Sequence, residues 1–245
     1  MKKRLYLAYG VTCYIIAMAT ILYAALFFGN IYAPRTIDVF GARPVKEALL
    51  VNATLIVLFA LQHSGMARPG FKRFVARIVP RCLVRSTYIL FSSVAIIVLM
   101  LFWQPIGSLV WSVGPGPFRW MIVAAYVSGW VLILWGTCLI DHCEMFGLRQ
   151  TWAAYRGGTC PEPEFRTPGV YRHVRHPIHA GWLIVLWATP VMTVTHLLLA
   201  MGMTIYIVAG TRLEEKCLAE RFPDYRQYAR KVPMLIPSLR RRLDT

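Results

Sequence analysis

The sequence is short of charged residues, and of acidic residues above all. Only 16% of its 245 residues are Asp, Glu, Lys or Arg, whereas a soluble globular domain carries about 25%. The apolar fraction is 57% and the mean hydropathy is +0.52. A chain this poor in charge cannot cover a water-soluble surface of ordinary composition. The composition therefore predicts an integral membrane protein.

Acidic residues number 11 against 27 Lys and Arg, which gives a net charge of +16. In a soluble protein this balance would suggest a nucleic-acid partner, but no nucleic-acid-binding motif accompanies it. Of the 27 cations, 23 fall before Leu5, in 67–86, in 141–177 and from Arg212 onward. The intervening stretches hold Arg35, Arg43, Lys46 and Arg119. Positive charge collects on the cytosolic side of membrane proteins, so we expect cytosolic termini and contact with anionic lipid.

The chain also lacks the patterns typical of disulfide and metal sites. Its six cysteines form no Cys-x-x-Cys pair, and Cys82, Cys143, Cys160 and Cys217 fall on the expected cytosolic side, so we expect reduced thiols or small apolar residues. The run His173, His176, His179 invites comparison with membrane di-iron oxygenases. However, Pro177 interrupts this three-residue spacing, and no His-x-x-x-His box occurs. We therefore predict no metal site.

Four apolar segments, 5–28, 47–66, 87–103 and 119–140, predict membrane helices. The links between them are expected to be a cytosolic loop over 67–86 and a turn-rich outer connection over 104–117. A cytosolic stretch over 141–177 follows, helical only near 152–155. The uncharged segment 178–211 is expected to form a hairpin of two helices of roughly 16 residues, each barely long enough for a bilayer core of about 30 Å. Pro190 and 193–196 mark the expected turn.

Two polar clusters flank this hairpin segment, at 171–179 and 212–215. If the segment folds back on itself, the clusters meet at one face of the membrane. Charges that flank an apolar helix are commonly interfacial anchors. Here the first cluster brings imidazole, guanidinium and phenol groups opposite a pair of glutamates, and such a gathering favours a functional site.

The paired clusters resemble the C-terminal signature of the isoprenylcysteine carboxyl methyltransferase superfamily. That pattern reads Gly-x-Tyr-x-x-x-Arg-His-Pro-x-Tyr-x-Gly, a helical hairpin, Glu-Glu, Phe-Gly-x-x-Tyr-x-x-Tyr and Val-Pro-x-x-x-Pro. The matching residues cover about the last third of the chain and are Gly169, Tyr171, Arg175, His176, Pro177, Gly181, Glu214, Glu215, Phe222, Tyr225, Tyr228, Val232, Pro233 and Pro237. Further upstream, 62–68, 146–150 and 165–168 resemble a narrower family, the bacterial methanethiol S-methyltransferases. Two features depart from the pattern: His179 replaces a Tyr, and 222–225 is one residue short.

The resemblance implies an all-α membrane enzyme that uses S-adenosylmethionine to methylate a small apolar thiol, methanethiol, to dimethyl sulfide. It implies one domain over 1–245, with a four-helix core over 1–140 and a cofactor-binding region over 141–245 that contains the hairpin 178–211 and a cytosolic tail. The expected setting is a bacterial cell membrane, with lipids as neighbours and without nucleic-acid or protein partners. The residues that the resemblance assigns to the cofactor are Tyr171, Arg175, His176, Pro177, His179, Glu214, Glu215, Tyr225 and Tyr228.

Each residue type suits one part of that cofactor. Arg175 or Arg212 could hold its carboxylate, since guanidinium binds carboxylate in a bidentate manner. Glu214 or Glu215 could bind the ammonium or the ribose hydroxyls. We treat Arg212 as a catalytic candidate as well, because its charge would also act on the reacting thiol.

Methyl transfer to sulfur requires a thiolate, because the thiol is a poor nucleophile. His63 near the end of the second helix and His142 at the end of the fourth could accept the proton. A histidine at such a position can also be an interfacial residue with purely structural partners, and the sequence leaves both interpretations open.

Three other functions remain compatible with the sequence. The same fold could methylate a lipid amine or a prenylcysteine carboxylate. An NADPH-dependent sterol-type reductase has a similar Arg-His-Pro hairpin pattern. A scaffold or transporter would use the charged clusters as anchors only.

The distribution of cations generates a test of topology. A reporter active only in the periplasm, fused after Thr245, is expected to be silent, whereas a cytosolic reporter at the same position is expected to be active. A periplasmic signal would contradict the hairpin, because an unpaired fifth helix would export the tail.

Overall fold

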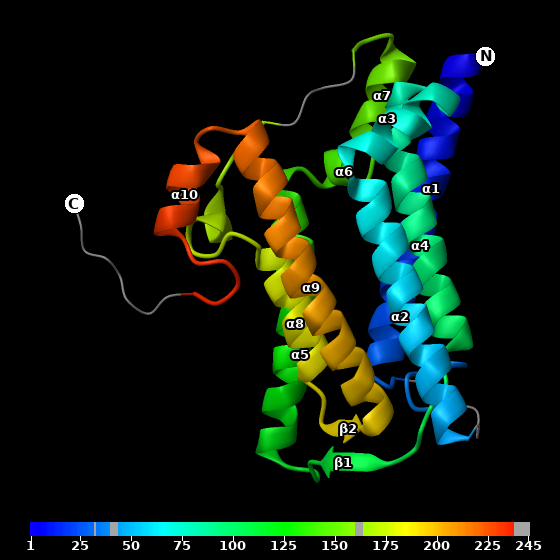
Figure 1. The fold of residues 1–245 in the computed structure, drawn as a ribbon, viewed down its shortest axis with the longest axis vertical. Helices are drawn as coiled ribbons and strands as arrows, with labels where there is room; N and C mark the ends of the chain where they lie inside the picture. The colour runs from blue at the N-terminus through cyan, green and yellow to red at the C-terminus, as the bar shows by residue number, and fades with distance from the viewer. Residues whose placement is uncertain (32, 40–43, 160–163, 238–245) are drawn as a thin grey trace. The chain divides into compact units, whose positions relative to one another are not determined.

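The computed structural model describes residues 1–31, 33–39, 44–159 and 164–237, and these residues are mostly helical (Figure 1). The chain divides into two compact units. The first comprises Met1–Val113, His142–Glu162 and Pro190–Met203, and the second comprises Gly114–Asp141, Pro163–Thr189 and Thr204–Thr245. One long helix, α9 (Val194–Arg221), contributes to both units.

The first unit is built on three long helices, α1 (Lys2–Phe28), α2 (Val45–Ala67) and α4 (Val84–Phe102), of which α1 and α2 both pack on α4 (Figure 1). The first unit also contains the first turns of α9 and four shorter elements: α3 (Pro69–Ile78), η1 (Arg81–Leu83), α6 (His142–Met145) and α7 (Leu148–Arg156). α7 lies directly against α1, where Gly10 leaves space for the buried Thr151.

Buried polar groups fix the end of this unit where α4 leads into the following link. The Asn52 side chain donates to the Gln104 carbonyl at 2.7 Å and accepts from the Gln104 amide at 2.8 Å, so its amide group is satisfied although it is fully buried. Strand β1 (Leu109–Ser112) then pairs antiparallel with β2 (Val191–Thr193). Thr193 ends β2 and caps α9, because its hydroxyl accepts from the His196 amide at 3.1 Å.

The second unit contains α5 (Pro117–Ile140), η2 (Gly169–Arg172), α8 (Pro177–Trp187), the later turns of α9 and α10 (Tyr225–Lys231). α8 and α9 form an antiparallel hairpin. Three contacts show this directly, because the residue number falls on one helix as it rises on the other: Trp187 with Thr204, His179 with Thr211 and Arg175 with Glu215.

Among the residues that the structure describes, five helical segments are long and apolar enough to cross a membrane: α1, α2, Arg81–Phe102, α5 and α9. The first four correspond to the predicted membrane helices, and the predicted hairpin is also present. Its two arms, however, are unequal, so the prediction of two helices of roughly 16 residues is wrong. α8 has 11 residues and ends shortly before Pro190, which cannot continue a helix. α9 has 28 residues, about 42 Å at 1.5 Å per residue, and continues past 212–215 to Arg221.

Three local predictions also need correction. The segment 67–86 contains α3, since Phe71, Phe74 and Ile78 form one apolar helical face and Pro69 occupies the first turn. The connection 104–117 contains β1, whose residues pair with β2. The helix expected near 152–155 is longer, Leu148–Arg156.

Cys13, Cys82, Cys138, Cys143 and Cys217 are free thiols, and Cys160 lies outside the described residues.

Glycines set the separation between α5 and α8. A Cβ atom added at Gly181 would lie 2.8 Å from the Gly129 carbonyl oxygen and 3.2 Å from the Ile133 amide nitrogen. Both neighbours are backbone atoms on α5 and cannot rotate away. The helices therefore pack through small residues, as membrane helices commonly do.

We expect Gly181→Ala to destabilise the protein by about 1–3 kcal/mol, the usual cost of overpacking. The matched control is Gly65→Ala on α2, where an added Cβ meets nothing within 4 Å and where alanine favours the helix. Thermal unfolding in detergent measures both. A Gly181→Ala protein as stable as the Gly65→Ala control would show that the α5–α8 packing tolerates a wider separation.

Candidate functional site

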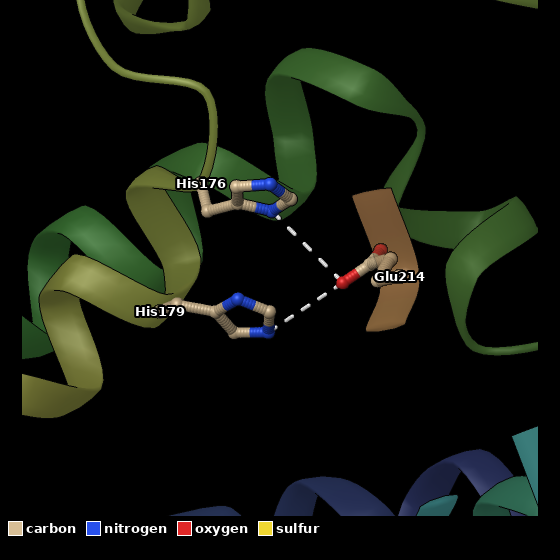
Figure 2. Close-up of side chains that lie close together, drawn as sticks. All are labelled: His176, His179 and Glu214. Atoms are coloured by element: carbon tan, nitrogen blue, oxygen red, sulfur yellow. Dashed lines mark ion pairs between the residues drawn. The ribbon is translucent and has the colours of Figure 1, made fainter. Parts of the chain in front are cut away.

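The α8–α9 hairpin brings together the two polar clusters that flank it in the sequence. Arg175 and His176 lie just before α8, His179 lies in its first turn, and Glu214 and Glu215 lie on α9. Figure 2 shows the two imidazole rings side by side, opposite the Glu214 carboxylate. The prediction that these segments meet is therefore confirmed.

Arg175 joins three parts of this unit. Its Nε donates to Glu215 Oε1 at 2.6 Å, and its Nη1 donates to the carbonyls of Ala229 at 2.7 Å and Val232 at 2.5 Å. Its backbone amide donates to the Pro233 carbonyl at 2.9 Å. The guanidinium thus links the start of α8 to α9 and to the end of α10. These bonds already engage Nε and Nη1, the groups expected to bind a cofactor carboxylate.

His176 is buried and is oriented by Glu215. Its Nε2 lies 3.1 Å from Glu215 Oε1, while the Tyr225 hydroxyl lies 3.4 Å from the same nitrogen. A carboxylate only accepts hydrogen bonds, so Nε2 carries the proton in the neutral ring. The other nitrogen, Nδ1, then presents a lone pair, and it lies 3.9 Å from Glu214 Oε2.

His179 is oriented in the same way by Thr211. The Thr211 hydroxyl donates its one proton to the Ile207 carbonyl at 2.7 Å, so it must accept from His179 Nδ1 at 2.9 Å. This assigns the proton of the neutral ring to Nδ1 and leaves a lone pair on Nε2. Nε2 also lies 3.9 Å from Glu214 Oε2.

Three acceptors therefore converge on one point: His176 Nδ1, His179 Nε2 and Glu214 Oε2 (Figure 2). Two lone pairs and a carboxylate oxygen repel one another unless a proton or another positive group lies among them. The arrangement suits a cation. Pro177 does not separate these histidines, contrary to the prediction from the sequence, because proline is compatible with the first turn of a helix and the rings stack with centroids 5.3 Å apart.

Aromatic residues border this polar cluster. The rings of Phe165 and Tyr225 and those of Phe165 and Tyr228 meet edge to face, and Phe165 stacks on Phe222. The Tyr228 hydroxyl donates to the Tyr171 carbonyl at 2.5 Å. Tyr225, which ends the shortened segment 222–225, and Tyr228 therefore both lie beside the cluster, and Tyr225 is the one that reaches His176.

The tyrosine hydroxyls remain protonated. Burial raises the pKa of Tyr228 to about 12, and burial also raises the pKa of Tyr171 and Tyr225 above its ordinary value. Tyr171 is buried and donates to the Gly136 carbonyl on α5 at 3.2 Å, so its hydroxyl supports packing between η2 and α5. Arg212, in contrast, is exposed on α9, one turn before Glu215.

His63 and His142, the two candidate bases, both belong to the first unit. His63 has a partner at each ring nitrogen: Nδ1 lies 3.1 Å from Ser92 Oγ, and Nε2 lies 2.8 Å from the Tyr88 hydroxyl. His142 Nε2 lies 3.1 Å from the Tyr14 hydroxyl. Both ring nitrogens of His63 are therefore engaged by hydroxyl groups of α4.

Sequence reasoning missed Thr211, the residue that orients His179. Its signal was present, since Thr211 lies three and four residues before Glu214 and Glu215 and hence on the same face of a helix. The carbonyls of Ala229 and Val232 had no such signal, because backbone acceptors are not distinguished by sequence.

Curated relatives match almost the whole chain. It is 41% identical to "Methanethiol S-methyltransferase" from Crocosphaera subtropica, over 97% of this chain and 93% of the relative. It is 47% identical to the protein of the same name from Pseudomonas deceptionensis, over 87% of this chain and 82% of the relative. "Nurim" from Xenopus laevis is 34% identical over 67% of this chain and 60% of the relative.

Residues 50–232 match a protein family described as "Protein of unknown function (DUF1295)". No solved structure matches the chain.

Proposed function

This chain belongs to the family of methanethiol S-methyltransferases, and from this premise we propose that it methylates methanethiol to dimethyl sulfide. The observation that carries the proposal is the name shared by relatives that match nearly the full length of the chain. Their names favour methyl transfer over a nicotinamide-dependent reduction or a purely structural role.

We propose S-adenosylmethionine as the methyl donor. When bound, it supplies an electrophilic methyl group on a sulfonium whose leaving group is a neutral thioether. We assign the cofactor's ammonium group to the converging acceptors of His176, His179 and Glu214. A cation placed among these three atoms satisfies all of them at once.

The remaining residues divide between binding and positioning. Arg212 is exposed one turn before Glu215 and is assigned to the cofactor carboxylate, while Phe165 and Tyr225 offer aromatic surface for the adenine. Arg175 and Glu215 act as positioning residues, since their ion pair holds His176 and the end of α10 in place. Pro177 contributes by starting α8 immediately after His176.

The thiol must lose its proton to attack the methyl group. We assign this proton transfer to His63, whose ring nitrogens form hydrogen bonds with the hydroxyls of Ser92 and Tyr88. His142, which forms a hydrogen bond with Tyr14, is the alternative base. Arg212 would stabilise the thiolate by its charge. Exclusion of water then favours attack by the less solvated sulfur.

We further propose that the chain is one membrane domain over 1–245 in the bacterial cell membrane. Its cation-rich segments and both termini would face the cytosol, the compartment in which the cofactor is found. The five apolar helices in the described part of the chain support a multi-pass arrangement, and the division of the cations supports the orientation. Methanethiol, being small and apolar, could enter from the lipid phase.

Removal of a cofactor-binding side chain should weaken cofactor affinity. We expect Glu214→Ala, Glu215→Ala and His176→Ala each to cost about 1.5–3 kcal/mol, which is roughly tenfold or more in Kd, because each loses a charge-assisted hydrogen bond or the residue that orients one. Isothermal titration of S-adenosylmethionine into the purified protein measures the change. Glu220→Ala, an exposed change on the same helix, is the matched control.

Thermal unfolding of each variant separates loss of binding from loss of fold. Unchanged affinity in all three folded variants would return these residues to the role of interfacial anchors.

Proton transfer at His63 should appear in turnover rather than in cofactor affinity. We expect His63→Ala to lower kcat by about 10²–10⁴-fold, the usual contribution of a general base, and to be partly rescued at high pH as free thiolate accumulates. A pH–rate series with methanethiol measures this effect. Tyr14→Phe, which removes the partner of His142, tests the alternative base in the same assay.

A structural role for His63 gives a different result. The rate would then fall only in proportion to the folded fraction and would show no recovery with pH. Equal rates per folded molecule across the series would remove His63 from the mechanism.

A further inference from the structure

We propose that His176, His179 and Glu214 bind a divalent transition-metal ion, and that this ion and the methyl donor exclude each other. The metal site stands on the geometry of the second unit alone. The mutual exclusion rests on the proposed function, in which the same residues bind the cofactor ammonium.

The potential ligand atoms already face one another. His176 Nδ1 and His179 Nε2 each lie 3.9 Å from Glu214 Oε2, and all three lie within 4.8 Å of one another (Figure 2). Metal–ligand bonds of about 2.0–2.2 Å in a tetrahedral site place neighbouring ligand atoms roughly 3.4 Å apart. The two distances to Glu214 each need to shorten by about 0.5 Å, and the Glu214 side chain, 52% exposed, can make this movement by a change of rotamer. The two imidazole nitrogens, which lie within 4.8 Å of each other, need to approach by up to about 1.4 Å, which the two rings can share.

The outer nitrogen of each ring has the partner that metal-binding histidines usually have. His176 donates from Nε2 to Glu215, which is itself held by Arg175, and His179 donates from Nδ1 to Thr211. Such contacts fix the tautomer and aim the unprotonated nitrogen at the metal. Both rings are thus prepared as ligands before any ion arrives.

The donor set selects the kind of ion. Two imidazoles and one carboxylate suit Zn²⁺, Co²⁺, Ni²⁺ and Cu²⁺, whereas Mg²⁺ and Ca²⁺ prefer oxygen ligands. Three protein ligands also leave coordination positions for water. We therefore expect Zn²⁺ or Co²⁺ to bind and Mg²⁺ not to bind.

An ion at this point conflicts with the methyl donor. It would occupy the Glu214 carboxylate and both lone pairs, the groups assigned to the ammonium. Its two positive charges would also repel the ammonium and the sulfonium. Transition-metal ions are therefore expected to inhibit methyl transfer in competition with S-adenosylmethionine.

The test is a Co²⁺ titration of the purified full-length protein in detergent, followed by the visible absorption of bound Co²⁺. We expect saturation at one ion per chain. Glu214→Gln and His179→Gln should lose this signal, and Thr211→Val, which removes the partner of His179, should weaken binding by about 10–100-fold. The matched controls are His173→Gln and Glu220→Gln, exposed residues near the cluster that leave all three ligands intact.

Glu214→Gln keeps the shape of an exposed side chain, so it remains informative if the buried variants fail to fold. No Co²⁺ signal in the wild type, or a signal unchanged in Glu214→Gln, would overturn the metal site. Loss of the Co²⁺ absorption when Mg²⁺ is added at an equal concentration would overturn the preference of the site for transition-metal ions.

Addition of S-adenosylhomocysteine, which keeps the ammonium, tests the exclusion separately. Loss of the Co²⁺ signal as it binds supports a shared site. A metal signal that depends on Glu214 but persists with the nucleoside bound would overturn the exclusion and the proposed cofactor placement, while leaving the metal site intact. Methyl transfer from labelled S-adenosylmethionine without metal reports on the proposed function independently.

Discussion

The contact between Arg175 and Glu215 determines the arrangement of the candidate site. Both side chains are largely withdrawn from solvent, with 12% and 20% of their surface exposed, and desolvating two charges is costly unless their hydrogen bonds are satisfied. The Arg175 guanidinium also donates to two carbonyls, that of Ala229 on α10 and that of Val232 just after it. Glu215 also accepts from His176. The ion pair therefore fixes three segments at once.

The first arm of the hairpin, α8, is held against α5 by a different kind of interaction. α5 approaches α8 so closely at Gly129 and Gly181 that a single added carbon would meet backbone atoms. In lipid there is no hydrophobic force between helices, so close packing of small residues has to supply the attraction. Close packing supports α8, which at 11 residues is too short to cross a bilayer core alone, and α8 in turn carries His179.

The paired histidines give the site its chemical character. Because Glu215 and Thr211 hold the outer nitrogens, the inner lone pairs are directed at the Glu214 carboxylate. A region rich in acceptors and poor in donors favours a positive ligand, whether an organic cation or a metal ion. The departure from the family pattern at His179, where a tyrosine is usual, supplies one of the two nitrogens.

Sequence by itself determined the membrane helices and the pairing of 171–179 with 212–215. Long apolar runs in a bilayer have to form helices, since no water is present to satisfy the backbone. The uncharged segment of 34 residues over 178–211 is too long for one span of about 20 residues, so it folds back and its flanking clusters meet. The sequence also identified His176, His179 and Glu214 as candidate site residues, although the position of Pro177 led to the wrong inference that the two histidines do not come together.

Tertiary structure decided the details on which the chemistry depends. The place where the hairpin turns follows from the pairing of β1 with β2, a long-range contact that, together with Pro190, keeps 191–193 out of the helix. The tautomers of His179 and His176 follow from their hydrogen bonds to Thr211 and Glu215. The positioning role of Arg175 follows from its hydrogen bond to the Val232 carbonyl, near the end of the described chain. Each depends on which atoms face each other across separate segments, and this is set by packing rather than by the periodicity of any one segment.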